Sequence, residues 1–183
     1  NCIIRGNGTV AQQGALSTVY MGGTAVMENC LLYGNNNYET AQVQLVGNAA
    51  IVNCTLIGNG AKPNLELKET SRAINCADFG GTAVPGTSLG ANYFYHACDK
   101  NVPTGATGWI KTTRAAALDD KYKPLEVLLR KGNAALYQEY ATSETDLAGK
   151  ARIRDGKMEM SIEGHDARDG KVEARTAMEK SCV

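Results

Sequence analysis

A seven-residue phrase that recurs through the first half of the chain limits its fold more than any other feature. The phrase begins with Asn-Cys, continues with three further residues and closes with Gly-Asn. It occupies residues 1–7, 29–35 and 53–59, and a degenerate copy that ends in Gly-Gly occupies residues 75–81. The cysteines of the four copies stand at positions 2, 30, 54 and 76, so the steps are 28, 24 and 22 residues. A repeat of this length, built from short apolar runs, indicates a solenoid.

Each repeat contains three short segments with the composition of β-strands, separated by polar corners. One repeat holds such segments at 17–21, 24–28 and 30–32, and the next holds them at 42–46, 49–52 and 54–57. Alternation in the fourth of these segments predicts that Val43 and Leu45 face inward, with Gln42 and Gln44 facing outward. Three strands within one repeat predict an all-β fold, a parallel β-helix with three strands per coil.

The repeated cysteines are expected to form a column along the solenoid. Cys2, Cys30, Cys54 and Cys76 occupy one repeat position, so they should stack on successive coils about 4.8 Å apart. Their side chains would point the same way, whereas a disulfide needs convergent Cβ vectors. We therefore predict buried, reduced thiols that act as small apolar groups. Two further cysteines, Cys98 and Cys182, lie outside the phrase, and their pairing stays open.

The repeated asparagines predict two further columns at the corners of the coils. One column holds Asn1, Asn29, Asn53 and Asn75, and the other holds Asn7, Asn35 and Asn59, with Gly81 ending it. A stacked amide can donate to the coil on one side and accept from the coil on the other. Such a network stabilises a fold when every member is satisfied, which a regular column achieves. Corner formation and stacking are the roles expected for these asparagines.

Charge and hydropathy favour neither nucleic acid nor a membrane as a partner. The chain has 19 basic and 19 acidic residues, and the first 61 positions carry only Arg5, Glu28 and Glu39. A neutral chain offers no overall electrostatic attraction for nucleic acid or an anionic bilayer. No apolar run approaches the roughly 20 residues that a spanning helix needs. Because the repeated phrase begins at residue 1, we expect this chain to be the C-terminal part of a longer protein.

The second half of the chain is expected to complete and close the solenoid. We divide the chain into β-helix coils at 1–81, an irregular last coil and capping segment at 82–150, and a C-terminal hairpin with a frayed tail at 151–183. Pro124 and the leucines after it predict a short helix that ends at Gly132, and residues 134–140 predict a second. Two Arg-Asp-Gly-Lys phrases, at 154–157 and 168–171, predict hairpins. These elements should cover the open end of the solenoid.

The repeats resemble the coils of right-handed parallel β-helix proteins of the pectin-lyase-like superfamily. The tail phrases 119–125, 132–133 and 146–152 resemble the end of bacterial choice-of-anchor Q proteins. Two phrases of that group are replaced in this chain, one by residues 128–132 and one by residues 158–164. The resemblance covers roughly residues 1 to 163, and it implies a right-handed β-helix in an exported bacterial protein. It implies no activity, because the group is defined by architecture and sorting.

The sequence supplies no constellation typical of a polysaccharide-cleaving enzyme. Lyases of this fold use clustered carboxylates for Ca²⁺ with a basic proton acceptor, and hydrolases use paired carboxylates. The early coils lack such clusters. The nearest grouping is Asp78, His96, Asp99 and Lys100, in which Asp78 is interpreted as marking a turn and His96 as a packed or solvated imidazole. The pair Asp119-Asp120 is interpreted as a capping or turn pair. No zinc or EF-hand spacing occurs, so we predict no cofactor and no metal site. Binding of Ca²⁺ stays an open alternative that no motif in the sequence supports.

The best exposed binding candidate is the corner formed by Asn35, Asn36, Asn37 and Tyr38. An aromatic ring beside amides supplies the stacking face and directional hydrogen bonds that sugar recognition needs. The sequence thus favours a secreted or cell-surface scaffold or adhesin-like module that contacts a polysaccharide or a host or plant glycan. The alternative is a lyase or glycoside hydrolase whose catalytic coils lie upstream. A stalk that neither binds nor cleaves is the third alternative.

Overall fold

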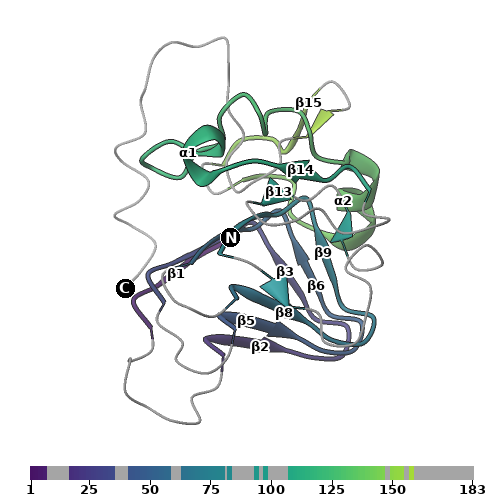
Figure 1. Cartoon of the computed structure of the whole chain (residues 1–183). Helices are drawn as coiled ribbons and strands as arrows, with labels where there is room; N and C mark the ends of the chain where they lie inside the picture. The colour runs from purple at the N-terminus through teal and green to yellow at the C-terminus, as the bar shows by residue number, and fades with distance from the viewer. Residues whose placement is uncertain are drawn as a thin grey trace.

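The computed structural model describes residues 1–7, 17–35, 41–58, 63–80, 107–146 and 149–154, with the pairs 82–83, 93–94, 97–98 and 157–158. It confirms the predicted right-handed parallel β-helix, in which three sheets form the walls of the solenoid (Figure 1). Sheet A contains β1 (Cys2–Arg5), β4 (Cys30–Tyr33), β7 (Thr55–Ile57), β10 (Ala77–Phe79), β13 (Ala97–Cys98) and β14 (Ile110–Lys111). Sheet B contains β2 (Val19–Met21), β5 (Val43–Leu45), β8 (Leu65–Leu67) and β11 (Thr82–Ala83). Sheet C contains β3 (Val26–Glu28), β6 (Ala50–Val52), β9 (Arg72–Ile74) and β12 (Tyr93–Phe94).

Each coil contributes one strand to sheet B, then one to sheet C, then one to sheet A. All pairs between coils are parallel and in register, so equivalent residues of the repeats meet directly. Cys2 is the partner of Cys30 in sheet A, and Val43 is the partner of Leu65 in sheet B. In this arrangement β-branched and aliphatic residues of successive coils stack on one another, which is the packing that pleated strands favour.

The interior is filled by one side-chain set from every strand. Leu32, Leu45, Ile51 and Leu56 are fully shielded from solvent within a single apolar cluster. Val43 and Leu45 face inward and Gln44 faces outward, as predicted. The outward placement of Gln42 was wrong: Gln42 precedes β5 at a corner, where its amide is buried and bonded to two neighbouring amides.

The asparagine corners between sheets C and A have a left-handed backbone. Asn29, Asn53 and Asn75 have φ angles of 53°, 56° and 53°. Asparagine tolerates this region better than other residues with a Cβ atom, which explains why it recurs at this position of the repeat. The corner turns the chain from one wall into the next within a single residue.

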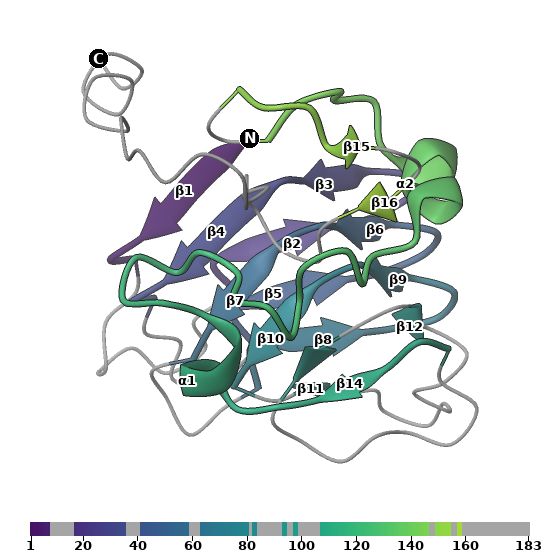
Figure 2. The same ribbon diagram turned by 90° about the horizontal axis from the view of Figure 1, so that it is seen from above.

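The described residues between 112 and 158, here named the strap, lie along the flank of the coils and not over their end. The strap contains α1 (Arg114–Ala117), α2 (Ala134–Tyr140), β15 (Ile153–Arg154) and β16 (Lys157–Met158). Figure 2 shows it crossing above β10 and β7 between α1 and α2. The predicted irregular cap with a short helix and a hairpin is confirmed, and it packs against the sides of the coils. The outer faces of sheets A and C carry apolar residues, and burying them against the strap is favourable.

Local features of the strap match the sequence in part. The helix at 134–140 is α2, and β15 and β16 form the hairpin predicted around Asp155-Gly156. Residues 126–130 form turns where a helix was predicted, and α1 was not predicted. Thr113 begins α1 by accepting a hydrogen bond from the backbone N–H of Ala116 at 3.3 Å. The second predicted hairpin, at 168–171, lies outside the described residues.

Candidate functional site

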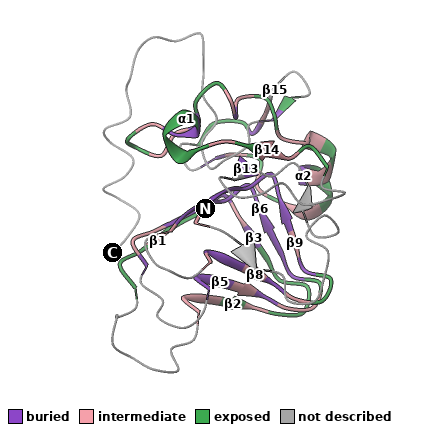
Figure 3. Cartoon of the chain, in the orientation of Figure 1, coloured by how far each residue is buried: buried purple, intermediate pink, exposed green. Residues whose placement is uncertain are grey.

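Of the three outer faces of the solenoid, the strap covers two. The outer residues Ile57, Ala77 and Phe79 of sheet A pack against Leu118 and Leu128 of the strap. On sheet C, the outer residues of β6 and β9 pack against α2 and Met158, and Figure 3 shows these strands as buried. Sheet B lies on the opposite side from both helices (Figure 1). Its outer face is therefore the wall left open by the described part of the chain.

The open face of sheet B carries a ladder of an aromatic, an amide and a carboxylate. Tyr20 of β2 is the register partner of Gln44 in β5, and Gln44 is the partner of Glu66 in β8. Tyr20 is 60% exposed, the most exposed large hydrophobic side chain described. The Gln44 amide donates a hydrogen bond to the Glu66 carboxylate. Lys68 Nζ lies 3.6 Å from the other oxygen of Glu66, so the ladder is close to neutral.

The sequence analysis missed Tyr20. The signal was present, because Val19-Tyr20-Met21 alternates and places the tyrosine on the outward position of a strand. The binding candidate chosen from sequence has a different setting. Asn35 is 5% exposed, and its amide donates to the Ile4 carbonyl and to Gln42. Asn36, Asn37 and Tyr38 lie outside the described residues.

Asn35 belongs to a chain of polar side chains that crosses the coils inside a corner of the solenoid. Asn7 donates to Asn35 at 3.1 Å, and Asn35 donates to Gln42. Gln42 then donates to Asn64 at 3.4 Å, and Asn64 donates to the Asp78 carboxylate at 2.9 Å. Every amide donates in the same direction, toward the carboxylate, so each bond polarises the next favourably. Asn59, expected in the same column as Asn7, lies outside the described residues.

Asp78 lies in β10 with its side chain inside the solenoid. It is fully buried and is preceded in its column by Leu32 and Leu56, so the interpretation of Asp78 as a turn residue was wrong. A buried carboxylate requires hydrogen-bond donors, and the Asn64 amide is one of them. Gly58 and Gly80 make room for this amide. A Cβ atom on Gly80 would lie 2.6 Å from Asn64 Oδ1, and one on Gly58 would lie 2.8 Å from it.

The cysteine column has a hydrogen-bonding role as well as an apolar one. The backbone N–H of Cys30 donates to the sulfur of Cys54 at 3.3 Å. The Cys54 thiol donates to the Val52 carbonyl at 3.3 Å, and the Cys76 thiol donates to the Ile74 carbonyl at 3.2 Å. Each thiol therefore bonds across the asparagine corner that precedes it in its own coil. Cys30, Cys54 and Cys76 are buried and free, whereas Cys2 is free and exposed on β1.

Burial makes the thiols of Cys54 and Cys76 difficult to ionise. Desolvation raises the pKa of Cys76 to about 12 and places the pKa of Cys54 well above its ordinary value. The unfolded chain loses these protons first, near pH 8.5, as the pH rises. The Cys76 thiol thus contributes stability that is complete below that pH and is lost as the pH rises toward 12.

We expect Cys76→Ser to flatten the alkaline decline of stability. Between pH 9.5 and 10.5 the free energy of unfolding of the parent protein should fall more than that of the variant, by about 1 kcal/mol. Urea denaturation at each pH measures this difference. Cys2→Ser is the matched control, because Cys2 is exposed, and it should keep the parent slope. An equal slope for Cys76→Ser and the parent protein would contradict a buried, protonated thiol.

Two further groups of sequence candidates have structural settings. One carboxylate oxygen of Asp119 accepts hydrogen bonds from the backbone N–H groups of Lys121 and Lys123, both at 2.8 Å, so Asp119 organises a turn. His96, Asp99 and Lys100 lie outside the described residues. In the part of the chain that is described, no three His, Cys, Asp or Glu residues are grouped as metal ligands, and no helix is long and apolar enough to span a membrane.

Comparisons with protein-family models, with curated proteins and with solved structures each returned no match.

Proposed function

We propose that this chain is part of an extracellular or cell-surface bacterial β-helix that acts as a scaffold or adhesin-like module and contacts carbohydrate through sheet B. The observation that carries the proposal is that sheet B is the wall left open by the strap and displays Tyr20, Gln44 and Glu66 in line. The resemblance of the repeats and the tail to exported bacterial proteins supports the location.

The chemistry of the ladder suits a polysaccharide that runs along the solenoid axis. An exposed phenol ring offers an apolar face on which a sugar ring can stack, and the amide and carboxylate offer directional hydrogen bonds to hydroxyl groups. Successive coils repeat at about 4.8 Å, so the ladder presents one polar group per coil to a chain of sugars. Because Lys68 offsets the charge of Glu66, a neutral glycan fits this face better than an acidic one.

We expect Tyr20→Ala to weaken glycan binding by about tenfold, because one stacked aromatic residue contributes on the order of 1 to 1.5 kcal/mol. A glycan array identifies the ligand, and calorimetry with that glycan measures the loss. Leu125→Ala is the matched control, since Leu125 is also an exposed apolar residue but lies on the strap. Equal affinities for Tyr20→Ala and the parent protein would place binding elsewhere.

The same samples test the alternative of a polysaccharide lyase or hydrolase with its active site in upstream coils. Glu66 is the single carboxylate on the described strands of sheet B, whereas hydrolysis needs a pair. Incubating the full-length protein with each bound glycan, with and without Ca²⁺, separates retention from cleavage. New reducing ends or unsaturated products would contradict the scaffold proposal and show that the protein is a hydrolase or a lyase.

A further inference from the structure

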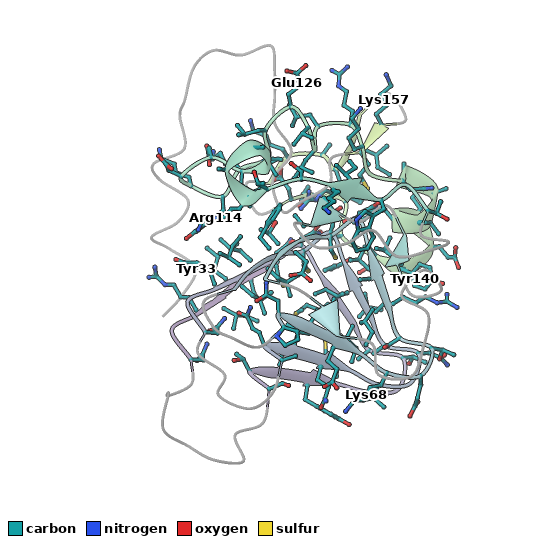
Figure 4. All side chains as sticks on the ribbon, viewed as in Figure 1. Tyr33, Lys68, Arg114, Glu126, Tyr140 and Lys157 are labelled. Atoms are coloured by element: carbon teal, nitrogen blue, oxygen red, sulfur yellow. The ribbon has the colours of Figure 1, made fainter. Side chains whose placement is uncertain are left out.

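Two tyrosines and two arginines form a continuous cluster where the strap meets sheet A. Arg5 donates a hydrogen bond to the Tyr33 hydroxyl at 2.8 Å, and its guanidinium carbon lies 5.9 Å from the Tyr33 ring centroid. The rings of Tyr33 and Tyr122 are 5.1 Å apart and inclined by 45°. The guanidinium of Arg114 lies 4.9 Å from the Tyr122 ring. Figure 4 shows Tyr33 and Arg114 beside one another, although 81 positions separate them in the sequence.

The two positive charges of this cluster have no carboxylate at ion-pair distance among the residues that the structure describes. The ion pair between Lys68 and Glu66 belongs to sheet B and does not involve this cluster. Arg5 and Arg114 are both exposed, and each guanidinium group lies over a tyrosine ring. Guanidinium groups fixed in this way lose little further conformational freedom when they bind an anion.

The backbone of the strap is strained at this place. Tyr122 has a φ angle of 64°, a region that is unfavourable for a bulky side chain. The turn is held by Asp119, whose carboxylate bonds the residues on both sides of Tyr122 and whose carbonyl accepts from Tyr122 itself at 3.0 Å. Strained residues persist where the surrounding structure fixes them, and they concentrate at binding sites.

The exposed apolar residue Ile3 lies on the same strand as Arg5. Ile3 lies two positions before Arg5 on β1, on the same outward face, and is 40% exposed. Tyrosine and arginine around an exposed aliphatic side chain are the composition of protein-binding hot spots. A polyhydroxylated sugar chain gains little from an isoleucine, whereas a peptide that carries aliphatic and acidic side chains uses both parts of this surface.

We propose that Ile3, Arg5, Tyr33, Tyr122 and Arg114 form a docking surface for an acidic segment of a protein partner. Aspartate or glutamate side chains of the segment bind the two guanidinium groups, and an apolar side chain between them contacts Ile3 and the tyrosine rings. This surface lies on sheet A and the strap, apart from the glycan face on sheet B. The two proposals therefore stand independently, and Tyr20→Ala leaves this surface intact.

A phage-displayed random peptide library, panned on the full chain, tests the proposal without knowledge of the natural partner. We expect the enriched peptides to contain acidic and apolar residues together. For a synthetic copy of an enriched peptide, Arg5→Ala and Arg114→Ala should each weaken binding by about tenfold. Lys157→Ala is the charge-matched control on a distant part of the strap and should leave the affinity unchanged (Figure 4).

The variants must stay folded for this comparison, which protection of the buried thiols from alkylation verifies. Arg5→Lys and Arg114→Lys separate charge from geometry, and they should show a smaller loss than the alanine variants. The proposal is overturned if no peptide is enriched, if enriched peptides lack acidic residues, or if they bind the double alanine variant equally well. Binding of heparin or polygalacturonate that depends on the arginines, with no peptide enriched, would assign the surface to an acidic glycan instead.

Discussion

Gly80→Ala is expected to lower the free energy of unfolding by about 3 to 5 kcal/mol, although it adds only one methyl group. The new Cβ atom would lie 2.6 Å from both Cγ and Oδ1 of Asn64, so the amide must move away. When it moves, Asp78 loses a hydrogen-bond donor inside the solenoid. Removing one hydrogen-bond donor from a buried carboxylate is among the most destabilising effects of a single substitution. Urea denaturation followed by circular dichroism measures the loss.

Gly22→Ala is the matched control for this substitution. Nothing lies within 4 Å of a Cβ atom on Gly22, so the variant should change the free energy of unfolding by less than about 1 kcal/mol. Asn64→Ala identifies the mechanism, because the clash disappears once the amide is absent. The loss caused by Gly80→Ala in the Asn64→Ala background should therefore be much smaller than in the parent protein. Additive losses would show that Gly80 acts independently of Asn64.

Asn75→Ala is expected to destabilise the protein by about 2 to 4 kcal/mol and to loosen the strap. The substitution removes three bonds to the strap at once. Asn75 Oδ1 accepts from the Asn133 backbone N–H at 2.8 Å, and Asn75 Nδ2 donates to the Asn133 carbonyl at 3.0 Å and to the Met158 sulfur at 3.4 Å. It also places alanine at a φ angle of 53°. Denaturation measures the total loss, and limited proteolysis followed by mass spectrometry measures cleavage within residues 112–158.

Asn75→Gly separates the two contributions. Glycine adopts the left-handed backbone without strain, so this variant loses only the side-chain bonds and should be more stable than Asn75→Ala by about 1 kcal/mol. Both variants should expose the strap to protease to a similar degree. Strap cleavage equal to that of the parent protein in both variants would show that other contacts, such as those of Glu28, hold this part of the strap.

The repeat was sufficient to predict the coils because each unit satisfies the same local rules. The alternation of Val43, Gln44 and Leu45, the corner at Asn53 and the recurrence of Cys54 all act within one coil or between neighbours. The register then follows from stacking equivalent positions. A solenoid is nearly one-dimensional, so a sequence pattern with the right period contains most of its structure.

The path of the strap could not be predicted, because its contacts join residues that are far apart and follow no period. The Glu28 carboxylate accepts from the backbone N–H groups of Thr142 at 2.8 Å and Ser143 at 3.1 Å, across 114 and 115 positions. Asn29 donates to the Tyr137 hydroxyl at 3.1 Å. Nothing local distinguishes a tail that closes the end of a solenoid from one that turns back along its side.

The glycines of the repeated phrase have two roles, and the repeat pattern alone does not distinguish them. Gly6 and Gly34 have φ angles of 67° and 64°, as expected for corner residues. Gly58 and Gly80 occupy the same place in the phrase without a positive φ, and they are required because Asn64 packs against them. Glycine at the same repeat position is thus required by the backbone conformation in two coils and by the packing of a buried amide in the other two.

The strap reaches from the fourth coil back to the first residue, where Asn1 Nδ2 donates to Ser143 Oγ at 3.3 Å. During synthesis the opening coils leave the ribosome more than a hundred residues before the segment that binds their flank. Their outer walls must remain solvated, or bound by other proteins, until the strap has been synthesised. A release of the nascent chain before residue 140 would leave a ribbon of coils with unshielded sides, and such a product is expected to be cleared by proteolysis.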